Sequence, residues 1–197
     1  MNNERLTKLA ENISVNLTDI VRTHELFVFF HTLRVQRNEK FEQGDHSTWM
    51  LDKLCHVLAR MLILRVYELA FNKDSNKESC SINEIITDNH IIKRKIQYKY
   101  DSYRKKFYNK LRSLRVRCAH PIIFGTDHDN EYKMGFISEA VDEIKPIIQE
   151  IIVASGIEKV TLNKERKLTK KAVELLFEKI YLSDEEKQNQ IRLYEQL

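Results

Sequence analysis

The sequence contains very few of the residues that end helices and shape tight turns. Of its 197 residues only four are glycine and two are proline, while 42% are hydrophobic and 31% are charged. So few helix-breaking residues predict long helices joined by few turns. No run of alternating β-branched residues calls for a strand. We therefore expect an all-α protein, an antiparallel helical bundle.

Long apolar runs and paired cysteines are also missing. The longest apolar stretches, such as residues 26–30 and 61–64, are far too short to cross a bilayer, and the first residues lack the apolar segment of a signal peptide. Cys55, Cys80 and Cys118 are odd in number, widely spaced and form no Cys-x-x-Cys pair. This pattern predicts free thiols in a reducing cytoplasm, with no disulfide framework, zinc site or membrane attachment.

Apolar periodicity and capping residues divide the chain into helices and two larger parts. Helices are predicted over residues 3–15, 18–40, 47–71, 81–88, 90–119 and 133–154. Gly156 is expected to cap the last of these helices, and the polar, charged residues that follow it read as a linker. We therefore expect a helical bundle over residues 1–156, and a linker with a helical C-terminal appendage over residues 157–197.

Positive charge is concentrated in one segment, although the net charge of the whole chain is only +4. Residues 91–117 hold eleven lysines and arginines and a single acid, Asp101. Aromatic residues are interleaved with these cations: Tyr98, Tyr100, Tyr103, Phe107 and Tyr108. A surface that binds RNA or another single strand needs this combination of cations and rings. The alternative is a solvated helix face whose rings belong to the core.

The end of the basic segment carries Arg115 and His120, which are five residues apart. Helical periodicity places Arg115 beside the apolar stripe that faces the core. Pro121 should end the helix near Ala119, because a residue before proline avoids helical dihedrals, so the His120 ring could fold back towards Arg115. A guanidinium grips phosphate oxygens and an imidazole exchanges protons near neutral pH, so the pair suits phosphate chemistry. A histidine that merely caps the helix end would explain the same spacing.

Three further groups are weaker candidates for chemistry. Cys118 stands beside the arginines, but its position on the apolar stripe favours packing over a role as nucleophile. His24 and His31 share a helix face with no third ligand, which favours a packed or partner-facing surface over a metal site. Residues 127–129, Asp-His-Asp, could bind a divalent cation, although a surface turn explains them as well.

Three stretches of the chain also carry a family resemblance. Residues 115–120 form an Arg-x4-His motif with alanine before the histidine, residues 58–68 read Leu-Ala-Arg-Met-Leu-Ile-Leu-Arg-Val-Tyr-Glu, and a short segment at 81–86 follows at the expected place. On these features residues 16–155 resemble the HEPN superfamily of helical bundles, most closely its AbiU-like abortive-infection branch. The chain departs from that branch at Val116 and Pro121, where polar residues are common.

The resemblance implies a metal-independent endoribonuclease that needs no cofactor and works as a homodimer, with the motifs of two subunits meeting in one cleft. It implies that His120 acts as general base or acid on the RNA 2′-hydroxyl, while Arg115 holds the phosphate. The expected products are a 2′,3′-cyclic phosphate and a 5′-hydroxyl end. Arg117 is a reserve candidate for the catalytic arginine. The residues expected to bind or steer RNA are Arg112, Arg117, Lys110, Lys106, Lys105 and Tyr108.

We therefore expect a toxin-like or antiviral ribonuclease of an abortive-infection or toxin–antitoxin system, with RNA and a cognate antitoxin or defence protein as partners. Val116 and Pro121 favour a second hypothesis, a catalytically silent module of the same type that binds RNA or a partner protein. A third is a purely structural dimerisation bundle. RNA cleavage, salt-sensitive RNA binding without cleavage, and neither activity distinguish the three.

Overall fold

The computed structural model describes residues 3–40, 46–72, 81–119 and 134–157, and a few residues of helical conformation between positions 167 and 192. All regular secondary structure in these residues is helical, which confirms the predicted all-α class. The four main ranges contain the helices α1 (Asn3–Lys40), α2 (His46–Phe71), α3 (Ile82–Asp88), α4 (His90–Ala119) and α5 (Met134–Ala154). The predicted division of the chain after residue 156 stays a prediction.

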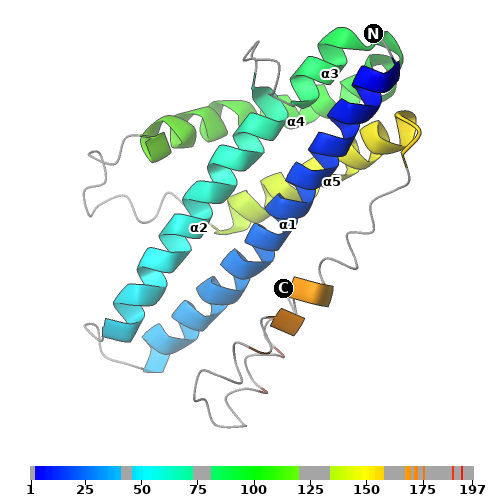
Figure 1. Ribbon diagram of the computed structural model, residues 1–197. Helices are drawn as coiled ribbons and strands as arrows, with labels where there is room; N and C mark the ends of the chain where they lie inside the picture. The colour runs from blue at the N-terminus through cyan, green and yellow to red at the C-terminus, as the bar shows by residue number, and fades with distance from the viewer. Residues whose placement is uncertain are drawn as a thin grey trace.

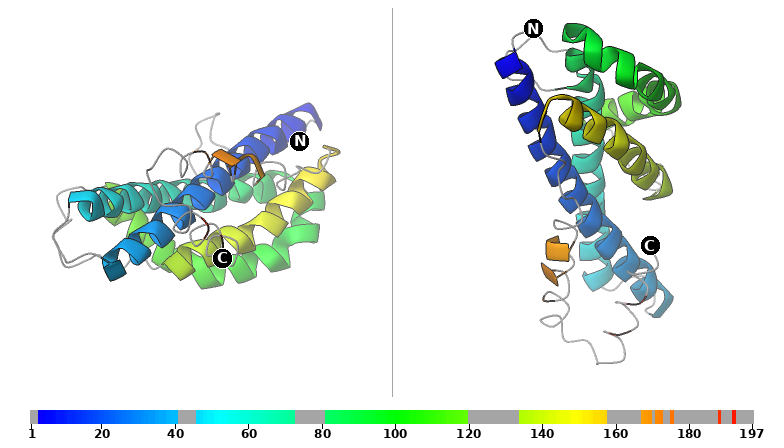
Figure 2. Two further views of the ribbon diagram at one scale, coloured as in Figure 1. Left: turned by 90° about the horizontal axis from the view of Figure 1, so that it is seen from below. Right: turned by 90° about the vertical axis from the view of Figure 1, so that its right-hand side faces the viewer.

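The helices form a bundle of two crossing pairs. α1 and α2 run antiparallel and side by side (Figure 1). α4 and α5 pack on one another and lie across that pair, with α4 on α2 and α5 on α1 (Figure 2). The short α3 joins the end of α2 to the start of α4. Within the described ranges no helix is both long and apolar enough to cross a bilayer.

α1 is one continuous helix of 38 residues, so the prediction of two helices over residues 3–15 and 18–40 is wrong. Leu17 is fully buried in the core, and the Thr18 hydroxyl donates to the Ser14 carbonyl at 3.0 Å. A threonine inside a helix commonly satisfies its hydroxyl in this way, so it does not have to act as a cap. The apolar stripe and the helix therefore continue through the predicted break.

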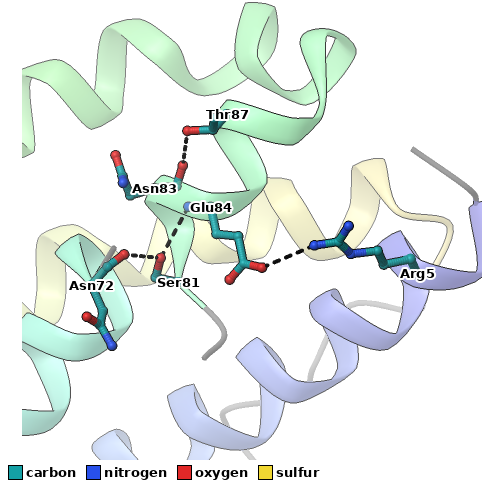
Figure 3. Close-up of polar contacts among 6 residues, drawn as sticks. All are labelled: Arg5, Asn72, Ser81, Asn83, Glu84 and Thr87. Atoms are coloured by element: carbon teal, nitrogen blue, oxygen red, sulfur yellow. Dashed lines mark hydrogen bonds and ion pairs between the residues drawn. The ribbon is translucent and has the colours of Figure 1, made fainter. Parts of the chain in front are cut away.

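The N-terminus of α3 is fixed by Ser81, the N-cap residue of the capping box that the sequence predicts (Figure 3). The Ser81 side chain accepts a hydrogen bond from the Glu84 N–H at 3.2 Å, and its hydroxyl donates to the Asn72 carbonyl at 2.7 Å. The Glu84 carboxylate forms an ion pair with Arg5 of α1 at 3.5 Å. α3 is thus held between the end of α2 and the start of α1, although it has only seven residues.

Gly156 caps the C-terminus of α5, as predicted. Gly156 has a φ of +78°, and its N–H donates to the Val153 carbonyl at 3.1 Å. The Ile157 N–H donates to the Ile152 carbonyl at 3.3 Å, which completes a Schellman motif, and the Ile157 side chain packs against the core. Pro146 lies inside α5 on its exposed side, where the carbonyl that its ring leaves unpaired can face water.

α4 buries one apolar stripe, and this settles the place of several aromatic residues. Tyr103 and Phe107 are almost fully buried, and the Tyr103 hydroxyl donates to a carbonyl of α5 at 3.2 Å. The Tyr100 hydroxyl donates to the Ala70 carbonyl at 3.0 Å, and burial raises the pKa of Tyr100 to about 12. These three rings belong to the core, and the Tyr103 and Phe107 rings do not offer stacking faces on an RNA-binding surface.

Candidate functional site

Two lysines of α4 are paired with glutamates of α5. Lys99 forms an ion pair with Glu150, and Lys106 forms ion pairs with Glu139, at 2.7 Å, and with Glu143. Hydrogen bonds to the two carboxylates raise the pKa of Lys106. The charge of Lys106 is therefore offset locally, which makes this residue less suited to steering RNA than the sequence predicts.

The side of α4 that faces α2 and α3 is different, because it lines a cavity of about 380 Å³. Arg104 and Arg115 both reach this cavity from α4. They are eleven residues apart, and three turns of helix return a side chain to nearly the same face. Within the part of the chain that the structure describes, no carboxylate forms an ion pair with either arginine.

Two arginines and two tyrosines form a continuous row in this cavity, which we call the Arg–Tyr–Tyr–Arg row: Arg104, Tyr108, Tyr67 and Arg115. The Arg104 Cζ lies 5.4 Å from the centroid of the Tyr108 ring. The Tyr108 and Tyr67 rings stack with centroids 6.2 Å apart and an interplanar angle of 27°. The Arg115 Cζ lies 4.9 Å from the centroid of the Tyr67 ring. A guanidinium held over a ring face keeps its N–H groups available for oxygen acceptors.

The electrostatics of the row favour anions. Burial raises the pKa of Tyr67 from its ordinary value of 10.0, and the adjacent Tyr108 phenol raises it further, while Arg115 and Arg112 oppose these effects. Tyr67 is therefore a neutral phenol at pH 7. Both arginines are positive at that pH. The row thus combines two fixed positive charges with neutral rings, a combination that attracts phosphate.

Of the two predicted catalytic residues, only Arg115 lies within the described residues. Arg115 is half-buried at the end of the row nearer the C-terminus of α4, and α4 ends at Ala119, where Pro121 predicts its end. His120 and Pro121 lie outside the described residues, so the approach of His120 to Arg115 stays a prediction. The Arg60 Nη2 of α2 donates to the Cys118 carbonyl at 2.6 Å, which holds the last turn of α4 immediately before His120.

The other predicted RNA-binding residues lie on or near the exposed surface of α4. Lys105 and Arg112 are exposed, and Arg117 is half-buried. Lys110 is also exposed, and its Nζ lies 4.1 Å from the centroid of the Phe136 ring. Lys105 and Arg112 thus stand on the side of α4 next to the row, whereas Lys110 faces α5 and Arg117 lies on the opposite side of the helix from Arg115. Tyr108 belongs to the row itself.

The weaker candidates behave mostly as packed residues. Cys118 is buried in the core, as its position on the apolar stripe predicts. His24 is buried and hydrogen-bonded to the Ser138 hydroxyl at 2.8 Å, and burial lowers the pKa of His31. The described residues contain no group of three side chains arranged to hold a metal ion. Residues 127–129 lie outside the described ranges.

Sequence reasoning missed several residues that meet at the cavity or support it. Arg104 stands one turn before Tyr108 in the basic segment, and that spacing was a usable signal. Arg60 and Tyr67 fall inside the stretch 58–68 that carries the family resemblance, but nothing local assigns them a contact with α4. Asn72 and Asn83 give no signal at all, because only the tertiary fold brings the end of α2 and the start of α3 to the same cavity.

Comparison of the chain with protein-family models, with curated proteins and with solved structures finds no match. The likeness to the HEPN superfamily therefore rests on the residues that carry it. Any functional conclusion has to be argued from the cavity and from the chemistry of the side chains around it.

Proposed function

We propose that this protein is a metal-independent endoribonuclease of HEPN type, with Arg115 and His120 as its catalytic residues. One observation carries the proposal. The Arg115 guanidinium is half-buried against Tyr67, in the same cavity as a second stacked arginine, with no carboxylate partner in the described residues. An arginine held in this way is prepared to bind a phosphate, and the next residue after the helix it stands on is a histidine.

The proposed reaction uses the RNA 2′-hydroxyl as the nucleophile. His120 takes the proton of that hydroxyl, the 2′-oxygen attacks the adjacent phosphorus, and the bond to the 5′-oxygen breaks as that oxygen takes a proton from solvent water. Arg115 stabilises the negative charge that grows on the phosphate oxygens. The hydrogen bond from Arg60 holds the last turn of α4, which His120 follows directly in the sequence.

The proposal includes a homodimer and a cellular setting. A two-fold axis would place two copies of the basic α4 surface side by side, which doubles the cationic area available to RNA. The resemblance suggests a toxin-like or antiviral enzyme of an abortive-infection or toxin–antitoxin system, acting on RNA and restrained or triggered by a partner protein.

A silent binding module of the same fold type is the second candidate. Val116 favours this candidate. Many HEPN proteins have a polar residue directly after the arginine, whereas the Val116 side chain is apolar and 49% exposed. In that case the stacked arginines would bind RNA without a functional proton donor and acceptor. Salt-sensitive RNA binding without cleavage would be the result.

Purified protein incubated with total RNA and tRNA in EDTA tests the proposal. We expect cleavage by the wild type and none by His120→Ala or Arg115→Lys, because an ammonium cannot replace the two parallel hydrogen bonds of a guanidinium. Arg94→Gln, which removes an exposed cation from the other end of α4, should cleave like the wild type. Cleavage by His120→Ala at the wild-type rate would contradict the proposed mechanism.

A further inference from the structure

The cavity beside α4 contains more recognition chemistry than one catalytic arginine needs. Besides Arg115 it holds a second stacked arginine, Arg104, and two amide side chains, Asn72 and Asn83. Its walls are otherwise aromatic. A polar cavity with several separate hydrogen-bonding groups and flat walls is typical of a site for a small, partly aromatic ligand.

The two arginines are placed to bind two anionic groups. Along α4, Arg104 lies one turn before Tyr108 and Arg115 two turns after it, and each guanidinium lies over a ring that stands between the two arginines in the row. Each guanidinium then reaches to a different tyrosine of the row. An arginine stacked on a ring binds oxygens through the edge of its planar group, so each end of the row suits one phosphate.

The volume of the cavity limits the size of the ligand that carries the two phosphates. About 380 Å³ is near the lower end of the range for small-molecule sites, roughly 300–1,000 Å³. One nucleotide fits this range, whereas a double helix does not. RNA is usually read as unstacked single strands, whose bases contact aromatic rings and expose their edges.

The amide side chains are suited to the edge of a base. Each amide offers both a donor and an acceptor. Asn83 is on α3, which Ser81 ties to the end of α2 and Glu84 ties to Arg5 of α1. Figure 3 shows Asn72 and Asn83 on the side of α3 opposite Arg5. The anchored helix therefore gives Asn83 a fixed position in the wall of the cavity.

We infer that this cavity recognises a single nucleotide of RNA together with both of its flanking phosphates, one bound by Arg104 and the other by Arg115, with its base against Asn83. The inference deepens the proposed function and rests on it for the identity of the phosphate at Arg115, which is the scissile one. Arg104 is then a positioning residue for the neighbouring phosphate and Asn83 contributes to base preference.

Equilibrium binding of nucleoside 3′,5′-bisphosphates to the full chain tests this inference. These probes carry both phosphates and contain no internucleotide bond to cleave. We expect a bisphosphate to bind about tenfold or more tightly than the 5′-monophosphate or inorganic phosphate, since each charge-assisted contact adds at least that factor. Arg104→Gln should abolish the difference, and Arg104→Lys should recover only part of it. Arg94→Gln removes an exposed cation of the same helix, and this variant should bind the bisphosphate like the wild type.

Equal binding of bisphosphate and monophosphate, or an unchanged difference in a folded Arg104→Gln protein, would overturn the inference. Thermal unfolding of each variant checks that it is folded. Asn83→Ala should reduce the differences in affinity among bisphosphates that carry the four bases. If those affinities keep the wild-type order and differences, Asn83 does not contact the base.

Parallel assays separate this inference from the proposed function. RNA cleavage without Arg104-dependent bisphosphate binding would overturn the recognition site and leave the nuclease standing. Arg104-dependent binding without any cleavage would overturn the nuclease and support the recognition site. A short single-stranded RNA should displace the bisphosphate. If it does not, the ligand is a free nucleotide and the RNA part of the inference is wrong.

Discussion

The surroundings of each cation on α4 decide what it can contribute to RNA binding. Lys106 has two glutamates of α5 beside it, whereas its neighbour Lys105 is exposed and has no carboxylate partner in the described residues. The sequence shows both as equivalent members of one basic run. Only the packing of α5 on α4 separates them, because the carboxylates that neutralise Lys106 come from more than thirty residues further along the chain.

Substitution of these two lysines should therefore have different consequences. Lys105→Gln should weaken RNA binding and lower the slope of log K against log salt by about 0.7, the loss expected for one contact with a single strand. Lys106→Gln should leave that slope close to the wild-type value. Binding titrations over a series of KCl concentrations, in a His120→Ala background that prevents cleavage, measure both. Equal reductions for the two variants would show that Lys106 contacts RNA despite its glutamates.

At the scale of the elements, the sequence predicts what depends on local signals. The bounds of α4, the Ser81 cap and the Gly156 cap of α5 are confirmed, because capping residues and apolar periodicity act within a turn or two. The break predicted near Thr18 is wrong, because buried packing on both sides outweighs a weak local signal. Tyr67 stacks on Tyr108 through a contact between helices, which periodicity cannot reveal.

The contact between α2 and the end of α4 gives a prediction at this scale. Arg60→Met keeps most of the apolar stem but removes the hydrogen bond to the Cys118 carbonyl. We expect a loss of about 1–2 kcal/mol in the free energy of unfolding, typical of a hydrogen bond from a charged group. RNA cleavage should fall more than RNA binding does, because Arg115 stands directly before the last turn of α4 and His120 follows that turn in the sequence.

Chemical denaturation and cleavage assays measure these effects, with Arg94→Met as the matched control on the exposed part of α4. If Arg60→Met cleaves RNA as fast as the wild type while its stability falls, the end of α4 does not depend on α2 for its catalytic position.

At the scale of the whole molecule, the all-α bundle follows from composition, and its core from the apolar stripes of the long helices. The candidate site does not. Arg115 was identifiable from its motif, but the cavity needs α2, α3 and α4 together, and its second arginine gains meaning only beside Tyr108. The residues of this site lie between positions 67 and 115, and only the folded chain brings them together, so the sequence alone does not reveal the site.

The proposed homodimer predicts complementation between damaged subunits. Mixed dimers of Arg115→Gln and His120→Ala chains would retain one intact arginine and one intact histidine at a shared cleft. We expect such mixtures, refolded together, to recover part of the cleavage rate that each variant lacks alone. Sedimentation of the wild type should show a dimer. Mixtures no more active than the separate variants would contradict a composite site.

The most direct test of the account is the product chemistry on a defined RNA oligonucleotide in EDTA. One substrate is all ribose, and a matched substrate has a single 2′-deoxy sugar at the cleavage position. We expect the wild type to cut only the first, leaving a 2′,3′-cyclic phosphate and a 5′-hydroxyl that mass spectrometry identifies. Cleavage of the 2′-deoxy substrate, or products with 5′-phosphate ends, would contradict attack by the 2′-hydroxyl and with it the roles proposed for Arg115 and His120.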